Sequence, residues 1–156
     1  FEYTSMLNLE REIANDFEPI TITNAKVLRV GKDISIVTYG TGVYKSLEAA
    51  TTLATFGIAA EVIDLRILRP LDEATVLASV AKTHRVLIVE DAWRSVSISS
   101  EISARIAEKA FYDLDLPIQR LCGVEVPIPY PIHLEEAAVP QINDIINAVK
   151  KMIHHD

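Results

Sequence analysis

Two glycines and an aspartate have the spacing of a dinucleotide-binding site. Gly40-Thr41-Gly42 follows an apolar run, and Asp64 ends the next such run, roughly 20 residues further on. In such sites the glycines let the backbone approach a pyrophosphate, and the carboxylate binds the ribose. The third glycine would fall where the chain has Lys45, whose bulk would obstruct helix–strand packing. We favour the competing interpretation, a flexible turn from strand to helix, and expect no binding of NAD or ATP.

Side chains that could act as nucleophiles lack the surroundings that such chemistry needs. Four serines stand close together, but no Gly-x-Ser-x-Gly elbow surrounds any of them: Ser95, Ser97, Ser99 and Ser100. We expect these serines to cap the helix that follows. Cys122 is the single cysteine and ends an apolar strand, which favours a buried, inert thiol.

The histidines and paired carboxylates do not form a catalytic or metal-binding pattern. His133 precedes Leu134-Glu135, which is not a His-Glu-x-x-His helix, and the tail ends in adjacent histidines that do not converge as ligands. Glu90-Asp91 follows a strand, at the place where open α/β sheets bind ligands, but no acid–base partner is in view. We therefore assign no catalytic, cofactor-binding or metal-binding residue to this chain.

Alternating strand and helix patterns predict the elements around these residues. Lys26–Val30 and Ile34–Tyr39 flank Gly31-Lys32-Asp33, which is typical of a hairpin. Further strands are expected at 59–65, 85–90 and 117–122, with helices at 43–56, from 72 to about 81, at 98–110 and after Pro140. This order predicts an α/β fold of three layers, α/β/α, with a mostly parallel sheet of about five strands and one antiparallel edge strand.

Residues 1–25 show no clean period, and we expect a linker or arm with at most one short helix near 7–16. Residues 26–156 form the predicted domain. Because the chain starts at Phe1 without a signal pattern, we expect a piece of a longer protein. A net charge of −7 argues against nucleic acid or an anionic membrane as a partner, and no apolar run is long enough to span a bilayer.

Several long strings together resemble one family. They are residues 31–40 (GKDISIVTYG), 61–72 (EVIDLRILRPLD), 89–93 (VEDAW), 114–120 (LDLPIQR) and 126–130 (VPIPY), followed by Leu134-Glu135 and Pro140. In this order they resemble the transketolase C-terminal domain of the beta subunits of 2-oxoacid dehydrogenase decarboxylases. The string at 126–130 looks most like the pyruvate dehydrogenase members, while branched-chain 2-oxoacid and acetoin dehydrogenases remain open alternatives.

The resemblance implies a role in assembly and not in chemistry. In this family thiamine diphosphate and magnesium bind between the alpha subunit and the N-terminal domain of the beta subunit. The resemblance implies that residues 1–25 are a linker or arm from this thiamine-binding domain, which is missing here. This piece alone is therefore expected to bind no thiamine diphosphate and to be inactive. The implied partners are the alpha subunit, a second beta subunit and the subunit-binding domain of the dihydrolipoyl acyltransferase. The implied location is the bacterial cytoplasm or the mitochondrial matrix.

Two segments are the candidate contact sites. Val126, Ile128, Tyr130 and Ile132 alternate with prolines, which predicts a stiff extended segment that either packs against a partner subunit or folds back on its own domain. Asp113 and Asp115 flank Leu114 in a turn before a strand. The resemblance implies that an aspartate at position 115, together with the chain terminus, binds the basic subunit-binding domain. The alternative is that Asp113 and Asp115 are solvated turn residues without a docking role.

Overall fold

A computed structural model describes residues 6–7, 10 and 24–154. The expected arm at 1–25 and its short helix lie almost entirely outside the described residues. In chain order the elements are β1 (Lys26–Arg29), β2 (Ile34–Thr38), α1 (Thr41–Thr55), β3 (Ala60–Asp64), α2 (Glu73–Thr83), β4 (Val86–Trp93), α3 (Ile98–Ala110), the 3₁₀ turn η2 (Phe111–Asp113), β5 (Gln119–Gly123), α4 (Ile132–Ala138) and α5 (Ile142–Ile153).

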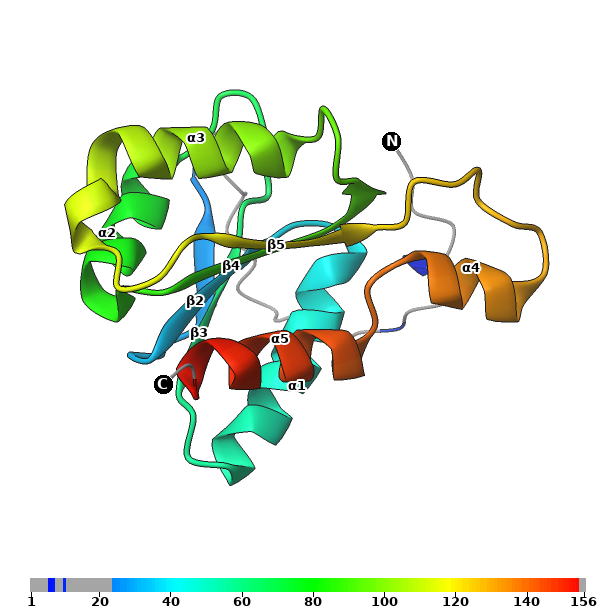
Figure 1. The fold of residues 1–156 in the computed structure, drawn as a ribbon, viewed down its shortest axis with the longest axis horizontal. Helices are drawn as coiled ribbons and strands as arrows, with labels where there is room; N and C mark the ends of the chain where they lie inside the picture. The colour runs from blue at the N-terminus through cyan, green and yellow to red at the C-terminus, as the bar shows by residue number, and fades with distance from the viewer. Residues whose placement is uncertain (1–5, 8–9, 11–23, 155–156) are drawn as a thin grey trace.

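The strands form one sheet between two layers of helices, as the sequence predicts. Their order is β1-β3-β2-β4-β5, and all neighbouring pairs are parallel except β1 with β3. In Figure 1, α2 and α3 lie above the sheet, and α1 and α5 lie below it. Each face has its own apolar core. Ile34, Ile36 and Leu53 belong to the core under α1 and α5, and Val37 and Ile106 belong to the one under α2 and α3.

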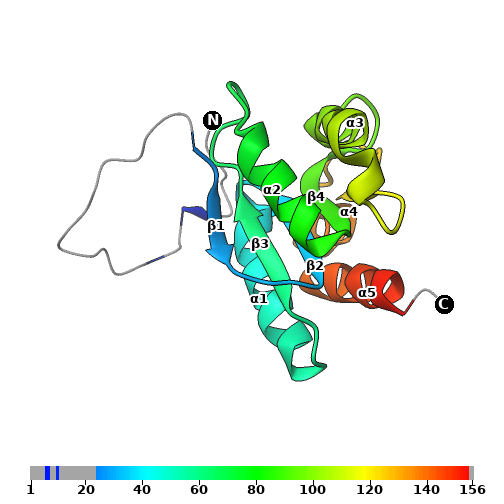
Figure 2. The ribbon, with the colours of Figure 1, turned by 90° about the vertical axis from the view of Figure 1, so that its left-hand side faces the viewer.

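The first strand is an antiparallel edge strand, but its predicted partner is wrong. The hairpin pattern places β1 beside β2, whereas β1 pairs with β3, with Lys26 opposite Asp64. Figure 2 shows β1 at the outer edge of the sheet, beyond β3. Residues 31–33 cross the start of β3 instead of turning back, since both Lys32 and Asp33 donate their N–H to the carbonyl of Ala59. Gly31 makes the crossing possible, because a Cβ there would collide with the backbone of Glu61.

A buried carboxylate secures this crossing. Glu61 is almost fully buried in β3 and accepts hydrogen bonds from the Gly31 N–H, the Ser79 hydroxyl and the Lys82 ammonium group. Burial pushes the pKa of Glu61 upward, but these hydrogen bonds outweigh it and hold the pKa below its ordinary value. The hydroxyl of Ser35 continues the network to Ser79, at 2.5 Å. Because its carboxylate oxygens are hydrogen-bonded, Glu61 can be buried in an apolar strand, and it connects β3 to α2 and to the β1–β2 connection.

Helix ends follow the sequence in most places. Asp72 caps α2 by accepting from Thr75 N–H, and Gly57 with φ of 78° follows the end of α1. Ser97 occupies the N-cap position of α3, but its side chain makes no capping hydrogen bond. It bonds Ser99 Oγ at 2.7 Å instead, so the predicted capping is wrong in its chemistry. No helix within the described residues is long and apolar enough to cross a membrane.

Candidate subunit interface

The turn that resembles a dinucleotide site is filled by the chain's own side chains. Thr41, the first residue of α1, donates its hydroxyl to the carboxylate of Asp91, so an anion of the domain itself lies at the N-terminus of this helix. Gly42 faces inward, since a Cβ there would collide with Thr38 Oγ1. Lys45, at the third glycine position, donates to the Pro140 carbonyl at 2.7 Å and ties α1 to the start of α5. A phosphate at this turn would have to displace a carboxylate.

The remaining candidates for chemistry at this edge also have structural partners. Asp64 accepts from the Arg66 N–H at 2.9 Å. Glu90 accepts from the Tyr39 hydroxyl at 3.2 Å, with the Cys122 sulfur 3.6 Å away. Desolvation raises the pKa of the Cys122 thiol, which is unfavourable for a nucleophile. In the part of the chain that the structure describes, no three His, Cys, Asp or Glu side chains meet as a metal would require.

Beyond β5 the chain makes an excursion that is closed at its base. We call residues 124–131 the proline arm; α4 follows it and brings the chain back. The base is closed by a hydrogen bond of 2.8 Å from the Val124 N–H to the Ala138 carbonyl. Gly123 is required there, because a Cβ would collide with the Asp91 carbonyl. Figure 1 shows the arm and α4 extending from the carboxyl end of the sheet, away from the other helices.

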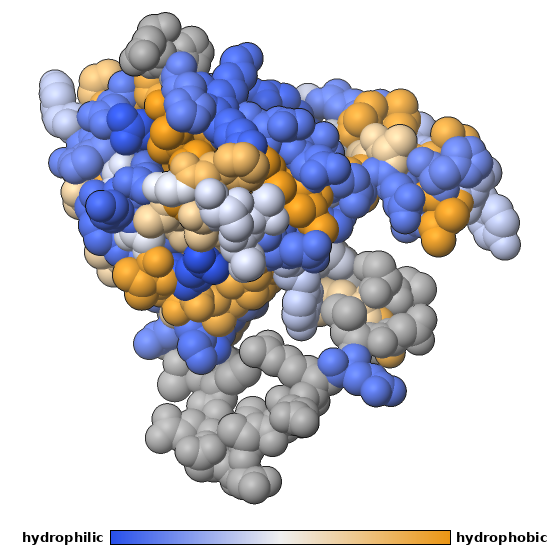
Figure 3. Space-filling view, turned by 90° about the horizontal axis from the view of Figure 1, so that it is seen from below, coloured by the Kyte–Doolittle hydropathy of each residue, from blue (hydrophilic) through white to orange (hydrophobic). Residues whose placement is uncertain are grey.

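The apolar side chains of the arm are in solvent. Tyr130 is 100% exposed, and the others of this stretch are also exposed: Val124, Val126, Ile128, Ile132 and Leu134. In Figure 3 hydrophobic side chains gather on the lobe at the upper right, which stands off from the rest of the molecule. Tyr130 and Ile128 are thus exposed in the domain by itself, and the packing of this segment against a partner subunit stays a prediction.

The fourth predicted interface residue is in a different conformation from the other three. Ile132 was expected to continue the extended segment, but it is the first residue of α4, with Pro131 at the N-cap position. The prolines exclude a helix before Pro131 but allow one directly after it. Proline has no backbone N–H, and the first turn of a helix does not use that group for an intrahelical hydrogen bond. The exposed apolar surface consequently continues onto a short helix that the sequence patterns did not indicate.

The first residues of the arm are held by the turn that follows β4. Glu125 Oε1 accepts from both the Ser95 N–H at 3.0 Å and the Ser95 hydroxyl at 2.6 Å. Trp93 donates its indole N–H to the Val126 carbonyl at 3.2 Å. The Ser95 hydroxyl and then its backbone N–H keep the pKa of Glu125 below its ordinary value. These contacts connect the arm to the sheet.

The two predicted docking aspartates lie at the opposite end of the sheet. Asp113 and Asp115 are exposed, and their loop is tied to the end of α2: Asp115 N–H donates to the His84 carbonyl, and His84 Nδ1 lies 2.7 Å from the Asp113 carbonyl oxygen. The carboxylate of Asp115 lies 3.2 Å from Arg85 Nη2. The exposed ring of Tyr112 lies next to this acidic pair. Asp115 thus already has an intramolecular cation, which its place in the sequence did not reveal.

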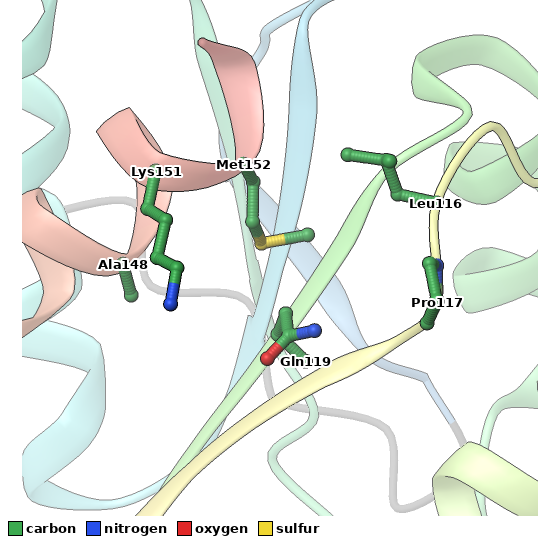
Figure 4. Close-up of a pocket in the computed structure, with 6 residues that line it drawn as sticks. All are labelled: Leu116, Pro117, Gln119, Ala148, Lys151 and Met152. Carbon is green, nitrogen blue, oxygen red and sulfur yellow. The ribbon is translucent and has the colours of Figure 1, made fainter. Parts of the chain in front are cut away.

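A groove adjoins this end of the domain. It has a volume of about 390 Å³ and lies between the start of β5 and the C-terminal half of α5. Figure 4 shows Met152 pointing into it from α5, opposite Leu116 and Pro117. The other lining residues are Gln119, Ala148 and Lys151. Its lining is mostly apolar.

The model of the family described as "Transketolase, C-terminal domain" matches residues 23–145. The chain belongs to this family. The match covers the sheet, the helices α1 to α4 and the proline arm, and it ends in the first turn of α5.

Curated relatives of this transketolase C-terminal domain are beta subunits of pyruvate dehydrogenase. The chain is 47% identical over 135 residues to the mitochondrial pyruvate dehydrogenase E1 component subunit beta of Drosophila melanogaster, covering 86% of this chain and 37% of that protein. It is 41% identical over 143 residues to the corresponding subunit of Rickettsia bellii, covering 92% of this chain and 44% of the relative. The chain therefore spans less than half the length of the relatives it matches.

Solved structures agree with the fold of this transketolase C-terminal domain. A split-gene transketolase, described as an inactive beta4 tetramer, superimposes with a TM-score of 0.79 at 27% identity, over 93% of this chain and 46% of that chain. A 2-oxoglutarate:ferredoxin oxidoreductase from Magnetococcus marinus, at 19% identity, has a TM-score of 0.58 over 85% of this chain and 20% of its own. The second likeness concerns the fold alone.

Three residues that hold the proline arm in place were not identified from the sequence. Trp93, Ser95 and Glu125 contact the arm or belong to it, yet the serines were interpreted as helix caps and Glu125 was not singled out. Trp93 ends β4 and is 48% exposed, so the strand pattern does not show what its indole N–H contacts. Its partner, a backbone carbonyl 33 residues away, leaves no trace in a sequence pattern.

Proposed function

We propose that this domain is the C-terminal assembly part of the beta subunit of a thiamine-dependent pyruvate dehydrogenase and pairs with a second beta subunit through the proline arm. The observation that carries the proposal is the fully exposed Tyr130 on a stiff, apolar, proline-rich arm. Leaving several large apolar side chains in water is unfavourable by about 1.5–3 kcal/mol for each one that a partner could bury. Exposed apolar patches of this kind mark interaction surfaces.

The chemistry belongs to the remainder of the proposed subunit. With the alpha subunit, thiamine diphosphate and magnesium, the heterotetramer would oxidatively decarboxylate pyruvate and pass an acetyl group to a lipoyl arm. The identities of 41% and 47% to pyruvate dehydrogenase beta subunits support this choice over branched-chain 2-oxoacid or acetoin dehydrogenases. Those relatives, one mitochondrial and one from Rickettsia, support a mitochondrial matrix or bacterial cytoplasmic location. The domain alone would be inactive.

Asp113 and Asp115 form the second proposed contact, a docking surface for the basic subunit-binding domain of the acyltransferase. Both are exposed and lie beside the exposed Tyr112, and the net charge of −7 favours a basic partner. The exposed part of Asp115 is large enough for a second cation to share the carboxylate with Arg85, since its side chain is 53% exposed. The participation of the chain terminus stays a prediction, because His155 and Asp156 lie outside the described residues.

Substitution of Tyr130 tests the pairing. In the full beta subunit, Tyr130→Ala should weaken self-association by about 2 kcal/mol or more, since a twofold interface loses the contact twice. Its effect on the melting temperature of the domain should be small, because the side chain touches nothing in its own domain. Sedimentation velocity over a dilution series gives the first quantity, and calorimetry gives the second.

Tyr112→Ala is the matched control, since Tyr112 is 98% exposed at the other end of the sheet. It should leave self-association unchanged. If both tyrosine variants associate as the wild type does, the proline arm is not the contact between beta subunits.

A further inference from the structure

The direction in which the proline arm leaves the domain is set by very few contacts. Among the described residues, none makes a side-chain hydrogen bond or ion pair with residues 127–133. Below that stretch, Glu125 and Val126 are fixed to Ser95 and Trp93. We propose that these contacts form a latch, and that Trp93, Ser95 and Glu125 are positioning residues for the interface. The inference rests on the proposed role of the arm.

The arm is a lever. A fully extended proline-rich segment rises about 3.1 Å per residue, so Tyr130 lies at most roughly 12 Å beyond Val126. A rotation of about 20° at the latch would then displace Tyr130 by up to about 4 Å. Packed interfaces tolerate far less, because a gap of about 0.5–1 Å already removes a quarter to a half of a van der Waals contact. The latch therefore decides whether the exposed apolar side chains meet their partner.

The geometry of the latch makes it specific. One oxygen of Glu125 accepts two hydrogen bonds from the same residue, Ser95, which fixes the carboxylate in both distance and direction. Such bonds to a carboxylate are stronger than those between neutral groups. The Trp93 N–H to the Val126 carbonyl is a third bond in the next residue of the arm. Together they prevent rotation at residues 125 and 126, which the base-closing bond at Val124 cannot do alone.

The turn that carries Ser95 is itself under strain. Val96 has φ of 56°, in the left-handed region that a β-branched residue rarely adopts, and its side chain is fully exposed. Such a conformation persists only where surrounding contacts enforce it. On one side of Val96 the Ser95–Glu125 bonds do so, and on the other side Ser97 bonds Ser99. The Ser95–Glu125 hydrogen bonds restrain both the turn and the proline arm. Removal of the Glu125 side chain should therefore make both more mobile.

Trp93 reports directly on the latch, since it is the single tryptophan of the chain. In the 156-residue chain, Glu125→Ala should shift its emission to longer wavelength and raise quenching by acrylamide. Ser95→Ala, which keeps the backbone donor, should give a smaller change. Glu125→Gln retains an acceptor oxygen and should restore most of the wild-type signal. Glu135→Ala removes the same charge from exposed α4 and should change nothing.

Association completes the test. In the full beta subunit, Glu125→Ala should weaken self-association about tenfold, because the arm of each copy is no longer held in position, with little change in the melting temperature. Unaltered Trp93 emission in Glu125→Ala would overturn the latch. Altered emission with unaltered association would overturn its positioning role if Tyr130→Ala still dissociates the subunit. If Tyr130→Ala also leaves association intact, the proposed function fails, while an emission change would still support the latch itself.

Discussion

Two acidic residues with similar side chains have opposite roles in this domain. Glu61 is almost fully buried and holds together three parts of the fold, whereas Asp115 is half exposed and shares its loop with a second exposed acid. The difference lies in what each carboxylate accepts. Glu61 has two neutral donors and one ammonium group within its own domain, and Asp115 has one guanidinium and free surface. The first should therefore control stability, and the second should control binding.

Replacement of Glu61 should lower stability, with a definite pH dependence. Glu61→Gln should cost about 1–3 kcal/mol at neutral pH, because it removes a charge that Lys82 and Ser79 bind. The folded pKa of Glu61 lies below its ordinary value, so its contribution is complete above that ordinary value, about 4.3, and is lost as the pH falls toward the folded pKa. The free energies of unfolding of wild type and variant should converge in that acid range.

Urea denaturation at a series of pH values measures this convergence. Glu48→Gln, at an exposed position on α1, is the control and should show neither the loss nor the convergence. A constant difference between wild type and Glu61→Gln down to pH 3 would contradict the account of the network.

Removal of the Asp115 carboxylate should affect binding more than folding. Asp115→Ala should weaken binding of the basic subunit-binding domain by about 2–5 kcal/mol, since a cation of the partner loses its carboxylate. The loss of the partly exposed pair with Arg85 should cost only about 0–1 kcal/mol of stability. Calorimetric titration of the intact heterotetramer at low salt would measure the affinity.

Arg85→Ala separates the two effects, because it breaks the same internal pair and leaves the carboxylate free. It should bind the partner at least as tightly as the wild type does. Equal losses of affinity in Asp115→Ala and Arg85→Ala would mean that the Arg85–Asp115 ion pair only stabilises its loop and that Asp115 does not contact the partner.

At the scale of elements, α1 packs on the sheet through a glycine that resembles a ligand-binding residue. Gly42→Ala would ordinarily favour a helix by about 1 kcal/mol. Here we expect a loss of about 1–3 kcal/mol, because the new Cβ meets the buried Thr38 Oγ1, which donates to the Val89 carbonyl. Thermal unfolding of the single variant measures the sign.

The double variant Thr38→Ala/Gly42→Ala supplies the control, since it removes the colliding oxygen. Its loss in free energy of unfolding should be smaller than the sum of the losses of the two single variants. Simple additivity would contradict a direct collision between the two residues.

The sequence was sufficient for the parallel strands and the four long helices, because each has its own hydrophobic period. It was insufficient for β1 and α4. The pairing of β1 with β3 depends on contacts of Gly31 and Asp33 with residues near the start of β3, and a hairpin pattern carries no information on such long-range contacts. The helix α4 is short and mostly exposed, so it has no buried stripe that a periodicity could reveal.

The candidate contact sites were predicted only in part. Alternating prolines and apolar residues predicted the stiffness of the arm, and its exposure became evident from the structure. The latch could not be predicted, since it joins Ser95 to Glu125 and Trp93 to Val126 across two separate loops. The docking role of Asp113 and Asp115 remains a prediction, with the bond from Arg85 as a new constraint on it.

For the whole molecule, the two proposed contacts lie at opposite ends of the sheet. The proline arm extends from the carboxyl end of the sheet (Figure 1), and the loop that carries Asp113 and Asp115 leads into the start of β5 at the amino end. A domain arranged in this way can bind a second beta subunit at one end without covering the surface for a basic partner at the other. We therefore expect this domain to affect activity through assembly.

The most direct test of that claim is the activity of the full heterotetramer as a function of protein concentration. With Tyr130→Ala in the beta subunit, pyruvate decarboxylation per active site should equal that of the wild type at high concentration. On dilution it should fall at a concentration about 30-fold higher than for the wild type, the factor that corresponds to about 2 kcal/mol. Tyr112→Ala should follow the wild-type curve. A reduced rate at every concentration, or a dilution curve that coincides with the wild type, would contradict an assembly role for the proline arm.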